Sequence, residues 1–487
     1  MFDFESYDFS GDFERDFGAV IKAFRNDAMF RKRVLKIAGK RVAVMFFEGM
    51  ADAIKVEEFL IKPLVMAENI PETAGNDYLC DRVFFASGIE KVFTFLQAIS
   101  GMQSGDTLII SEFGAPLISD TKGFRTRGVE EPGAERVLQG PREGFDEAAN
   151  LNVAMIRRKL KTPDLCIEKS TLGRRTATEI YICYLDSLVN REALAILKCR
   201  LSTIDIDGVL DSNYITELIR DGKRSIFKTV GTTERPDVAA ARLLEGRIAV
   251  IVDGTPMVLT VPYLFGENFQ SDEDYYVNFF VGSIGRSIRY LCFFLSTSIP
   301  AIFIALTTYH IGLLPTPFML SLAELRSGVP FSSVTECILL IIIFEILREA
   351  GTRTPQGLGS ALSIVGGLVV GQAAVEAKII SAPMLIAVAM AGVAELMIPR
   401  LKGAIFYLRL LFTLAASFMG LVGYMMIAAA VLISVLGQRS MGVDYTVTMR
   451  NPSLSGLKDT ILRAPWDMMK TRPQITKNRI RQREKYD

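Results

Sequence analysis

The sequence is poor in the residues that most often build metal and catalytic centres. It has a single histidine, His310, among 487 residues, and six cysteines that include no C-x-x-C pair. One histidine cannot supply a His-rich metal centre, and scattered cysteines are typical of reduced thiols rather than of disulfides or zinc ligands. No phosphate-binding loop or nucleophile elbow is present. We therefore expect no metal site, no cofactor, no catalytic residues and no enzymatic activity.

Long uncharged stretches are absent from the first part of the chain and frequent in the last part. Up to Arg286 no uncharged run is long enough to span a bilayer, which takes roughly 20 apolar residues. Beyond Arg289 four uncharged runs follow: Tyr290–Ala323, Thr354–Val375, Ile379–Ala394 and Leu410–Gln438. Three of these runs are long enough to cross a bilayer. The shorter run, Ile379–Ala394, is long enough if it extends to Met397. We expect a helical membrane domain at residues 290–437 with about four spans.

The two ends of the chain differ in charge. The start, "MFDFESYDFSGDFERDFGAV", is acidic and aromatic and lacks the basic and apolar regions of a secretory signal. The tail from Arg439 to Asp487 holds eleven Lys and Arg against five Asp and Glu. Basic flanks stay on the cytoplasmic side. We expect both ends in the cytoplasm, with an N-terminal extension (residues 1–38), a linker into the membrane (265–289) and a basic tail (438–487).

Two stretches of the soluble part are alike. In "SGDTLIISEFGAPLISDT" and "EGRIAVIVDGTPMVLTVP" a glycine precedes an apolar run, an acidic residue, a Gly-x-Pro turn and a second apolar run. This pattern predicts a β-hairpin with glycine at the positive-φ position. A strand followed by an amphipathic helix precedes each hairpin. The expected fold is an α+β soluble region of two similar α/β units, at residues 39–128 and 137–264, followed by an α-helical multi-pass membrane domain.

Beside these spans, the segment "TECILLIIIFEILREAG" predicts an amphipathic charged helix at residues 334–350, with an apolar run followed by charges. Glu345, Arg348 and Glu349 share one face of this helix. Charged groups at the bilayer centre cost about 2–4 kcal/mol each, so they face protein or water. One interpretation is a pore-lining carboxylate ring, and the other is a salt-bridged or interfacial helix. Glu395 and Arg409 also lie near spans and are predicted to pair across neighbouring helices.

Small residues and one proline mark the other expected spans. Gly359, Ser363, Gly367 and Gly371 recur at every fourth position, a pattern that lets helices pack closely or form a gate. Gln372 and Glu376 follow on a neighbouring face and are candidates for the ion path. Pro300 lies inside the first span, where it removes a backbone donor and needs a protein neighbour or water beside it.

Five long segments follow one another in the order found in a known family: "LQGPREGFDE" (Leu138–Glu147), "TERPDVAAARLLEGRIAVIVDGTP" (Thr233–Pro256), "FQSDEDYY" (Phe269–Tyr276), "SGVPFSSVTECILLIIIFEILREAG" (Ser327–Gly351) and "ALSIVGGLVVGQAAV" (Ala361–Val375). In these segments the chain resembles the A-subunits of GerA-type spore germinant receptors. The likeness covers roughly Val137 to Val443, and the first 130 residues and the tail match weakly.

The resemblance implies a subunit of a germinant receptor in the inner membrane of a bacterial spore, with the N-terminal domain and the tail in the spore core. Its partners would be a transporter-like B-subunit, a lipoprotein C-subunit and further copies of itself, without nucleic acid. The family implies an oligomeric channel or signalling subunit that passes monovalent cations when nutrients are sensed. A non-conducting scaffold and a solute transporter are the alternatives.

Overall fold

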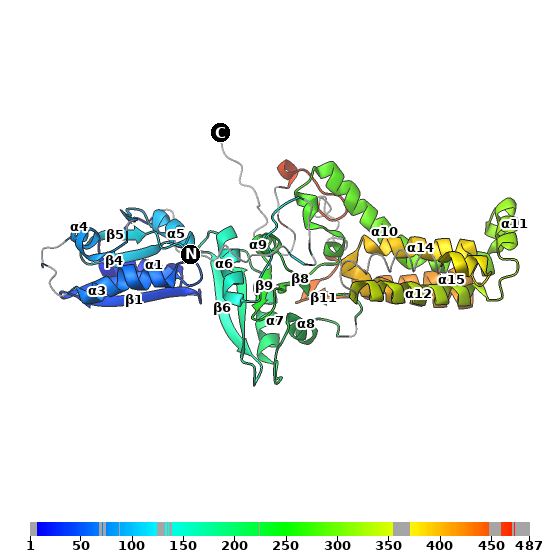
Figure 1. The fold of residues 1–487 in the computed structure, drawn as a ribbon, viewed down its shortest axis with the longest axis horizontal. Helices are drawn as coiled ribbons and strands as arrows, with labels where there is room; N and C mark the ends of the chain where they lie inside the picture. The colour runs from blue at the N-terminus through cyan, green and yellow to red at the C-terminus, as the bar shows by residue number, and fades with distance from the viewer. Residues whose placement is uncertain are drawn as a thin grey trace.

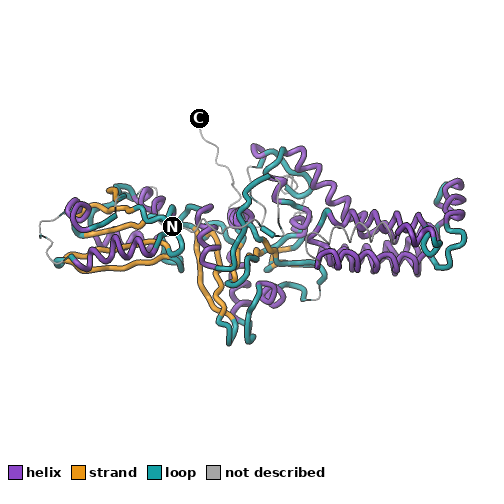
Figure 2. Tube along the Cα trace, viewed as in Figure 1, coloured by secondary structure: helices purple, strands orange, loops and turns teal. Residues whose placement is uncertain are grey.

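The chain forms an elongated molecule with three regions along its longest axis. The computed structural model describes residues 7–67, 71, 75–86, 88–123, 132–133, 135, 139–223, 225–353, 371–447, 459–469 and 472. One α/β unit lies at one end, a second lies in the middle, and long helices form the other end (Figure 1). In the tube view the strands occupy the first two regions, and the far end is helical (Figure 2).

The two α/β units share one sheet topology. The first sheet consists of β1 (Phe30–Ile37), β2 (Lys40–Phe47), β3 (Ile89–Lys91), β4 (Thr107–Ser111) and β5 (Gly114–Ser119), in the order β1-β2-β4-β5-β3. The second consists of β6 (Leu165–Leu172), β7 (Thr178–Leu185), β8 (Gly231–Thr233), β9 (Ile248–Val252) and β10 (Val258–Val261), in the order β6-β7-β9-β10-β8. Every pairing is antiparallel. The prediction of two similar α/β units is confirmed.

The hairpins formed by the two similar stretches contain glycines with positive φ, as expected. Gly114, the first residue of β5, has a φ value of 152°, and Gly254, in the loop between β9 and β10, has a φ value of 86°. Gly105 and Gly246, which precede the first strand of each hairpin, have φ values of 101° and 81°. Glycine adopts these conformations without the steric penalty that a Cβ atom brings. Glycine with positive φ thus allows a hairpin in each unit, although the loop spans residues 112–113 in the first and 253–257 in the second.

Short helices cover both faces of the sheets. They are α1 (Phe13–Ala23), α2 (Ala53–Lys55), η1 (Val56–Ile61), α3 (Lys62–Met66), α4 (Asn76–Tyr78), η2 (Leu79–Val83) and α5 (Phe95–Gln103), then α6 (Ala149–Lys159), α7 (Arg191–Ser202), α8 (Ser212–Ile219) and α9 (Pro236–Leu244). Alternate residues of β2 enter different cores: Ala43 and Met45 one, Val42 and Val44 the other. The first of these cores also holds residues of β7, β9, α6 and α9, so the two units share it. The structure thus includes α1 and β1 in the first unit, although we expected residues 1–38 to be an extension.

The linker leads into the helical region. It contains η3 (Phe265–Phe269) and η4 (Asp272–Tyr275), and the helical region contains α10 (Phe279–Thr308), η5 (Ile311–Leu313), α11 (Thr316–Leu325), α12 (Ser333–Arg353), α14 (Ala382–Leu396), η6 (Pro399–Leu401) and α15 (Lys402–Leu436). Phe279–Thr308 and Pro399–Leu436 are long and apolar enough to cross a membrane, and α14 is a shorter apolar helix. α10 begins within the expected linker, eleven residues before Tyr290.

The helix α15 reverses direction at Gly420. This glycine has φ 61° and ψ −139°, which is not helical. A Cβ atom on Gly423 would lie 2.3 Å from the carbonyl oxygen of Ala415, and the rings of Phe412 and Tyr424 are 5.3 Å apart. Residues this far apart in sequence cannot touch along one straight helix. The run Leu410–Gln438, expected to be a single span, therefore includes the tip of a helical hairpin whose arms are each roughly 25 Å long.

The chain returns from this hairpin to the middle of the molecule. There β11 (Arg439–Ser440) and β12 (Val443–Asp444) form a small sheet, and η7 (Trp466–Met468) follows. Ser440 Oγ donates a hydrogen bond to the carbonyl of Thr229 at 2.6 Å. Met441 packs into the core that the second sheet forms with α7 and α8. The start of the expected basic tail thus belongs to the folded middle region.

Candidate functional site

A chain of charged side chains crosses the interior of the helical region. Arg348 of α12 forms ion pairs with Glu345 on its own helix and with Glu395 of α14. Glu395 also pairs with Arg409 of α15, and these two side chains are each only 2% exposed. The predicted pairing of Glu395 with Arg409 across neighbouring helices is confirmed. The four charges cancel, which makes their burial among apolar helices tolerable.

Pro300 of α10 explains how this series of ion pairs ends at a backbone carbonyl group. Pro300 has no N–H, so the carbonyl of Ser296, four residues earlier, loses its helical donor. The Nε of Arg409 donates a hydrogen bond to this carbonyl oxygen at 2.8 Å. Arg409 is thus the protein neighbour that we expected beside Pro300. One arginine satisfies a freed backbone group and a buried carboxylate at once, and so ties α10, α14 and α15 together.

The remaining charged candidates lie at the outside of the single chain. The side chain of Glu349 is 47% exposed, with Lys402 Nζ at 3.8 Å. Gln372 Nε2 donates to Glu376 Oε1 at 3.0 Å, and both residues are exposed. The charged face that we predicted on α12 is therefore divided: Glu345 and Arg348 belong to the internal ion chain, and Glu349 faces outward.

The predicted stripe of small residues is described only at its last member. A Cβ atom on Gly371 would lie 3.5 Å from Leu385 of α14, which is ordinary close packing between neighbouring helices. Gly359, Ser363 and Gly367 lie outside the described residues.

A second buried carboxylate lies at the end of the helical region far from the sheets. Glu336, in the first turn of α12, is fully buried. It accepts hydrogen bonds from the backbone N–H and the hydroxyl of Ser381, at 3.0 and 2.7 Å, and lies 3.3 Å from Arg326. Glu336 thereby holds the start of α12 against the start of α14.

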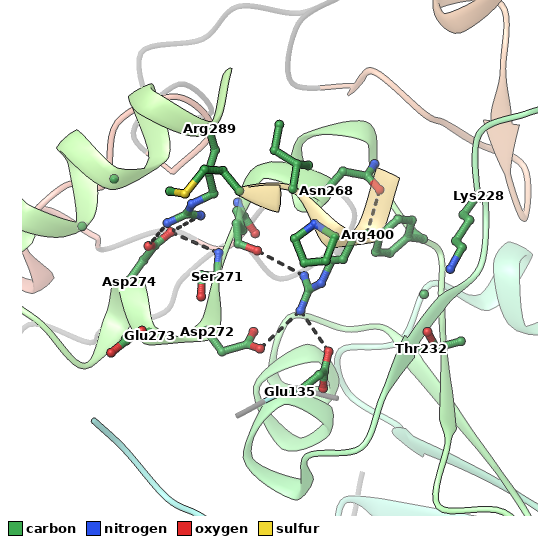
Figure 3. Close-up of a pocket in the computed structure, with 18 of the residues that line it drawn as sticks. Glu135, Lys228, Thr232, Asn268, Ser271, Asp272, Glu273, Asp274, Arg289 and Arg400 are labelled. Carbon is green, nitrogen blue, oxygen red and sulfur yellow. Dashed lines mark hydrogen bonds and ion pairs between the residues drawn. The ribbon is translucent and has the colours of Figure 1, made fainter. Parts of the chain in front are cut away.

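A cavity of about 660 Å³ lies where the second unit, the linker and the helical region meet (Figure 3). Arg400, in the turn before α15, occupies its centre. Its guanidinium donates to the carbonyls of Glu267 and Gln270, each at 3.2 Å. It also pairs with Glu135 at 3.1 Å and with Asp272 at 3.3 Å. Arg400 therefore fastens the base of the α15 hairpin to the linker.

One cation of this cavity differs from Arg400 in its surroundings. Lys228 lines the cavity and forms no ion pair within the part of the chain that the structure describes. Desolvation in the cavity and the neighbouring Arg400 guanidinium lower the pKa of the Lys228 ammonium. Sequence reasoning missed Arg400, Lys228 and Glu135, since no motif connects residues so far apart in the chain.

A compact ion network joins the second unit to the same linker. Arg247 pairs with Glu267 and lies 3.2 Å from Glu245, and Arg242 reaches the same two carboxylates at 3.3 and 3.2 Å. All four side chains are less than 10% exposed. Removing one member would leave uncompensated charge in a dry site. The linker is therefore held by arginines from both of its neighbours.

Comparisons with known proteins point to one family. Residues 16–475 match the family described as Bacillus/Clostridium GerA spore germination protein. The chain is 39% identical to spore germination protein KA of Bacillus subtilis (strain 168), over 89% of this chain and 80% of that protein. It is 34% identical to spore germination protein GerLA of Bacillus cereus, over 92% of both chains.

One solved structure is similar to the first half. It is the N-terminal domain of the A subunit of the Bacillus megaterium spore germinant receptor GerK3, with 28% identity and a TM-score of 0.42 over 53% of this chain and 98% of that one. The match of nearly the whole chain to one family, at up to 39% identity to its members, is decisive. The chain belongs to the GerA family of spore germination proteins.

Proposed function

We propose that this chain is the A-subunit of a spore germinant receptor and forms, as a homo-oligomer in the spore inner membrane, a channel for monovalent cations. It opens when the receptor senses nutrients, together with a transporter-like B-subunit and a lipoprotein C-subunit. The soluble units and the tail face the spore core. Family membership supports the receptor role, and the two long apolar helices support the membrane location.

The observation that carries the channel proposal is the placement of two outward carboxylates. Glu349 lies beside Lys402, which begins α15 two residues after the linker-bound Arg400, so it marks the end of the helical region that adjoins the linker. Glu376 lies two residues before Lys378, whose side chain approaches Gly328 in the loop between α11 and α12 at the opposite end. Exposed carboxylates on apolar helices require water or protein beside them. Copies arranged around an axis would place a ring of carboxylates at each mouth of a shared path, which favours cations.

The experiment is a current measurement on the purified full chain in planar bilayers, alone and with its partner subunits. We expect Glu349→Gln and Glu376→Gln to lower the preference for potassium over chloride. Glu345→Gln should instead weaken folding, because Glu345 serves the internal ion chain. Glu217→Gln, at an exposed site on α8, is the matched control. Unchanged selectivity in both outward variants would contradict the carboxylate rings.

The internal ion chain favours one alternative, a non-conducting scaffold. Glu345, Arg348, Glu395 and Arg409 neutralise one another within a single subunit, as they would in a purely structural bundle. A scaffold would assemble the receptor without conducting. Absence of any current with all subunits and nutrient present, together with intact assembly, would favour it.

A further inference from the structure

An apolar groove of about 520 Å³ runs along the first turns of α10. Its lining includes Phe280, Ile284 and Ile288 of α10, and Leu462 and Arg463 of the C-terminal segment. Phe280, Ile284 and Ile288 follow one another at four-residue spacing, and Phe280 is 64% exposed. They form a stripe on one face of the helix, and Leu291, which is 55% exposed and lines the same groove, extends it toward the apolar part of α10.

Arg463, at the side of this groove, is a buried cation without an acidic partner among the described residues. It is 4% exposed, its Nη1 donates to the carbonyl of Val277 at 2.7 Å, and within the same described part of the chain its Nε has no hydrogen-bond partner. The guanidinium lies 5.8 Å from the ring centroids of both Tyr275 and Trp466. These contacts orient the guanidinium but supply no negative charge.

The nearby carboxylates are committed to other arginines. Asp274 pairs with Arg286 at 3.2 Å and with Arg289, and Asp459 pairs with Arg286 at 3.0 Å. Asp467, on the same segment as Arg463, is exposed and forms no ion pair among the described residues. Three arginines therefore face two carboxylates, and the positive charge of Arg463 is left over. A buried unmatched charge is costly, so this position favours an added anion.

The groove lies at the level expected for lipid headgroups. α10 has 30 residues and is thus about 45 Å long, whereas the hydrocarbon core of a bilayer is about 30 Å thick. The surplus at its first turns lies toward the sheets, beside the turn at residues 466–468 (Figure 1). Trp466 there is 47% exposed, as is typical of aromatic residues at a membrane interface.

We propose that this groove binds an anionic phospholipid, with an acyl chain along Phe280, Ile284 and Ile288 and the phosphate paired with Arg463. This binding rests on the proposed function, because it requires that α10 enters a membrane. The position of the stripe on α10, a helix long and apolar enough to cross a membrane, selects a lipid over a soluble ligand. The surplus positive charge selects an anionic headgroup over a zwitterionic one.

The test uses the full chain purified in detergent, with phosphatidylglycerol and phosphatidylcholine of identical acyl chains. Lipid retention is measured by native mass spectrometry, and stabilisation by thermal unfolding. We expect phosphatidylglycerol to be retained preferentially. Arg463→Gln should weaken its retention about fivefold, which corresponds to the ~1 kcal/mol contributed by one arginine near an anionic surface. Arg439→Gln, at an exposed arginine, is the control and should change nothing.

A second variant keeps the test valid if Arg463→Gln fails to fold. Ile284→Trp, at an exposed position, should fill the groove and reduce retention while leaving the fold intact. Equal retention of the two lipids by the unmodified chain, or full retention by either variant, would overturn the proposal. So would equal stabilisation by inorganic phosphate alone. Failure of the chain to insert into liposomes would instead refute the membrane location and with it the proposed function.

Discussion

The two α/β units have one topology but different attachments. The second unit holds the linker through Arg242 and Arg247, and it receives the returning chain at Ser440. The first unit is joined to the second by their shared core and by the buried ion pair of Asp27 with Arg157. The second unit is thus the base of the helical region, and the first is an outer module.

The helices of the two copies show the same divergence. The second unit has the regular helices α7 and α8, whereas the first has two π-helical segments, η1 and η2. Such segments are rare and are frequent at functional sites. Apolar side chains beside them, including Phe59, Met66 and Phe85, are exposed. The contrast indicates that the first copy is free to contact other molecules, while the second is committed to support.

The largest expected effect breaks the attachment of the second unit. Arg247→Met leaves Glu245 and Glu267 with one arginine between them, and should lower the free energy of unfolding by about 3–5 kcal/mol. The comparison is Arg41→Met in the first unit, whose pairs with Glu14 and Glu112 are partly exposed to solvent, so its loss of stability should be much smaller. Chemical denaturation of the purified chain measures both. Equal losses would show that the two units are held alike.

A smaller effect is expected at the hairpin loop of the second unit. Gly254 has φ 86° and open space around it, so Gly254→Ala should cost about 1–2 kcal/mol through backbone strain alone. Gly254→Asn, which tolerates this conformation better, should recover part of the loss. The midpoint of thermal unfolding reports both. If Gly254→Ala leaves the unfolding midpoint unchanged, the positive φ angle does not select glycine at this loop.

The third prediction concerns charge rather than stability. Desolvation and Arg400 lower the pKa of Lys228, whereas hydrogen bonding to Asp106 raises the pKa of Lys122 in the first unit. Only a neutral amine reacts with an acylating reagent, so labelling of Lys228 should begin at a lower pH than labelling of Lys122. Mass spectrometry of peptides labelled between pH 7 and 11 measures the order. The opposite order would contradict the lowered pKa of Lys228 in the cavity around Arg400.

The smallest effect is expected on the outer surface of the first unit. Phe85 is 72% exposed, so Phe85→Ser should change stability by no more than about 0.5 kcal/mol. If the first unit contacts another receptor component, this variant should weaken co-purification while thermal unfolding stays the same. A large loss of stability would show that the residue is buried in the working assembly.

Local signals made the soluble part predictable. Turn glycines, the acidic residues before them and the alternation of apolar residues fix strands and hairpins within a few residues, and these signals occur twice. The pairing of Glu395 with Arg409 was also predictable, because two opposite charges within apolar helices have few other ways to be compensated.

Tertiary placement made the rest unpredictable. Glycine is common in membrane helices, so nothing in the uncharged run around Gly420 distinguishes a reversal from a straight span. The cause lies elsewhere: a Cβ atom on Gly420 would fall 2.8 Å from Tyr309 and 2.7 Å from the ring of His310. Likewise, the role of Arg400 depends on carboxylates more than a hundred residues away. Such partners become visible only when the chain is folded.

The helical hairpin of α15 begins and ends at the middle region, so both of its ends are attached to one base. Arg400 holds the first end of the hairpin, and the small sheet at residues 439–444 holds the second end. A rotation of that base must swing the whole hairpin, because neither arm can slide alone. The tip of the hairpin at Gly420, beside His310, is farthest from the base. A small tilt near the sheets would therefore produce a larger displacement at this tip.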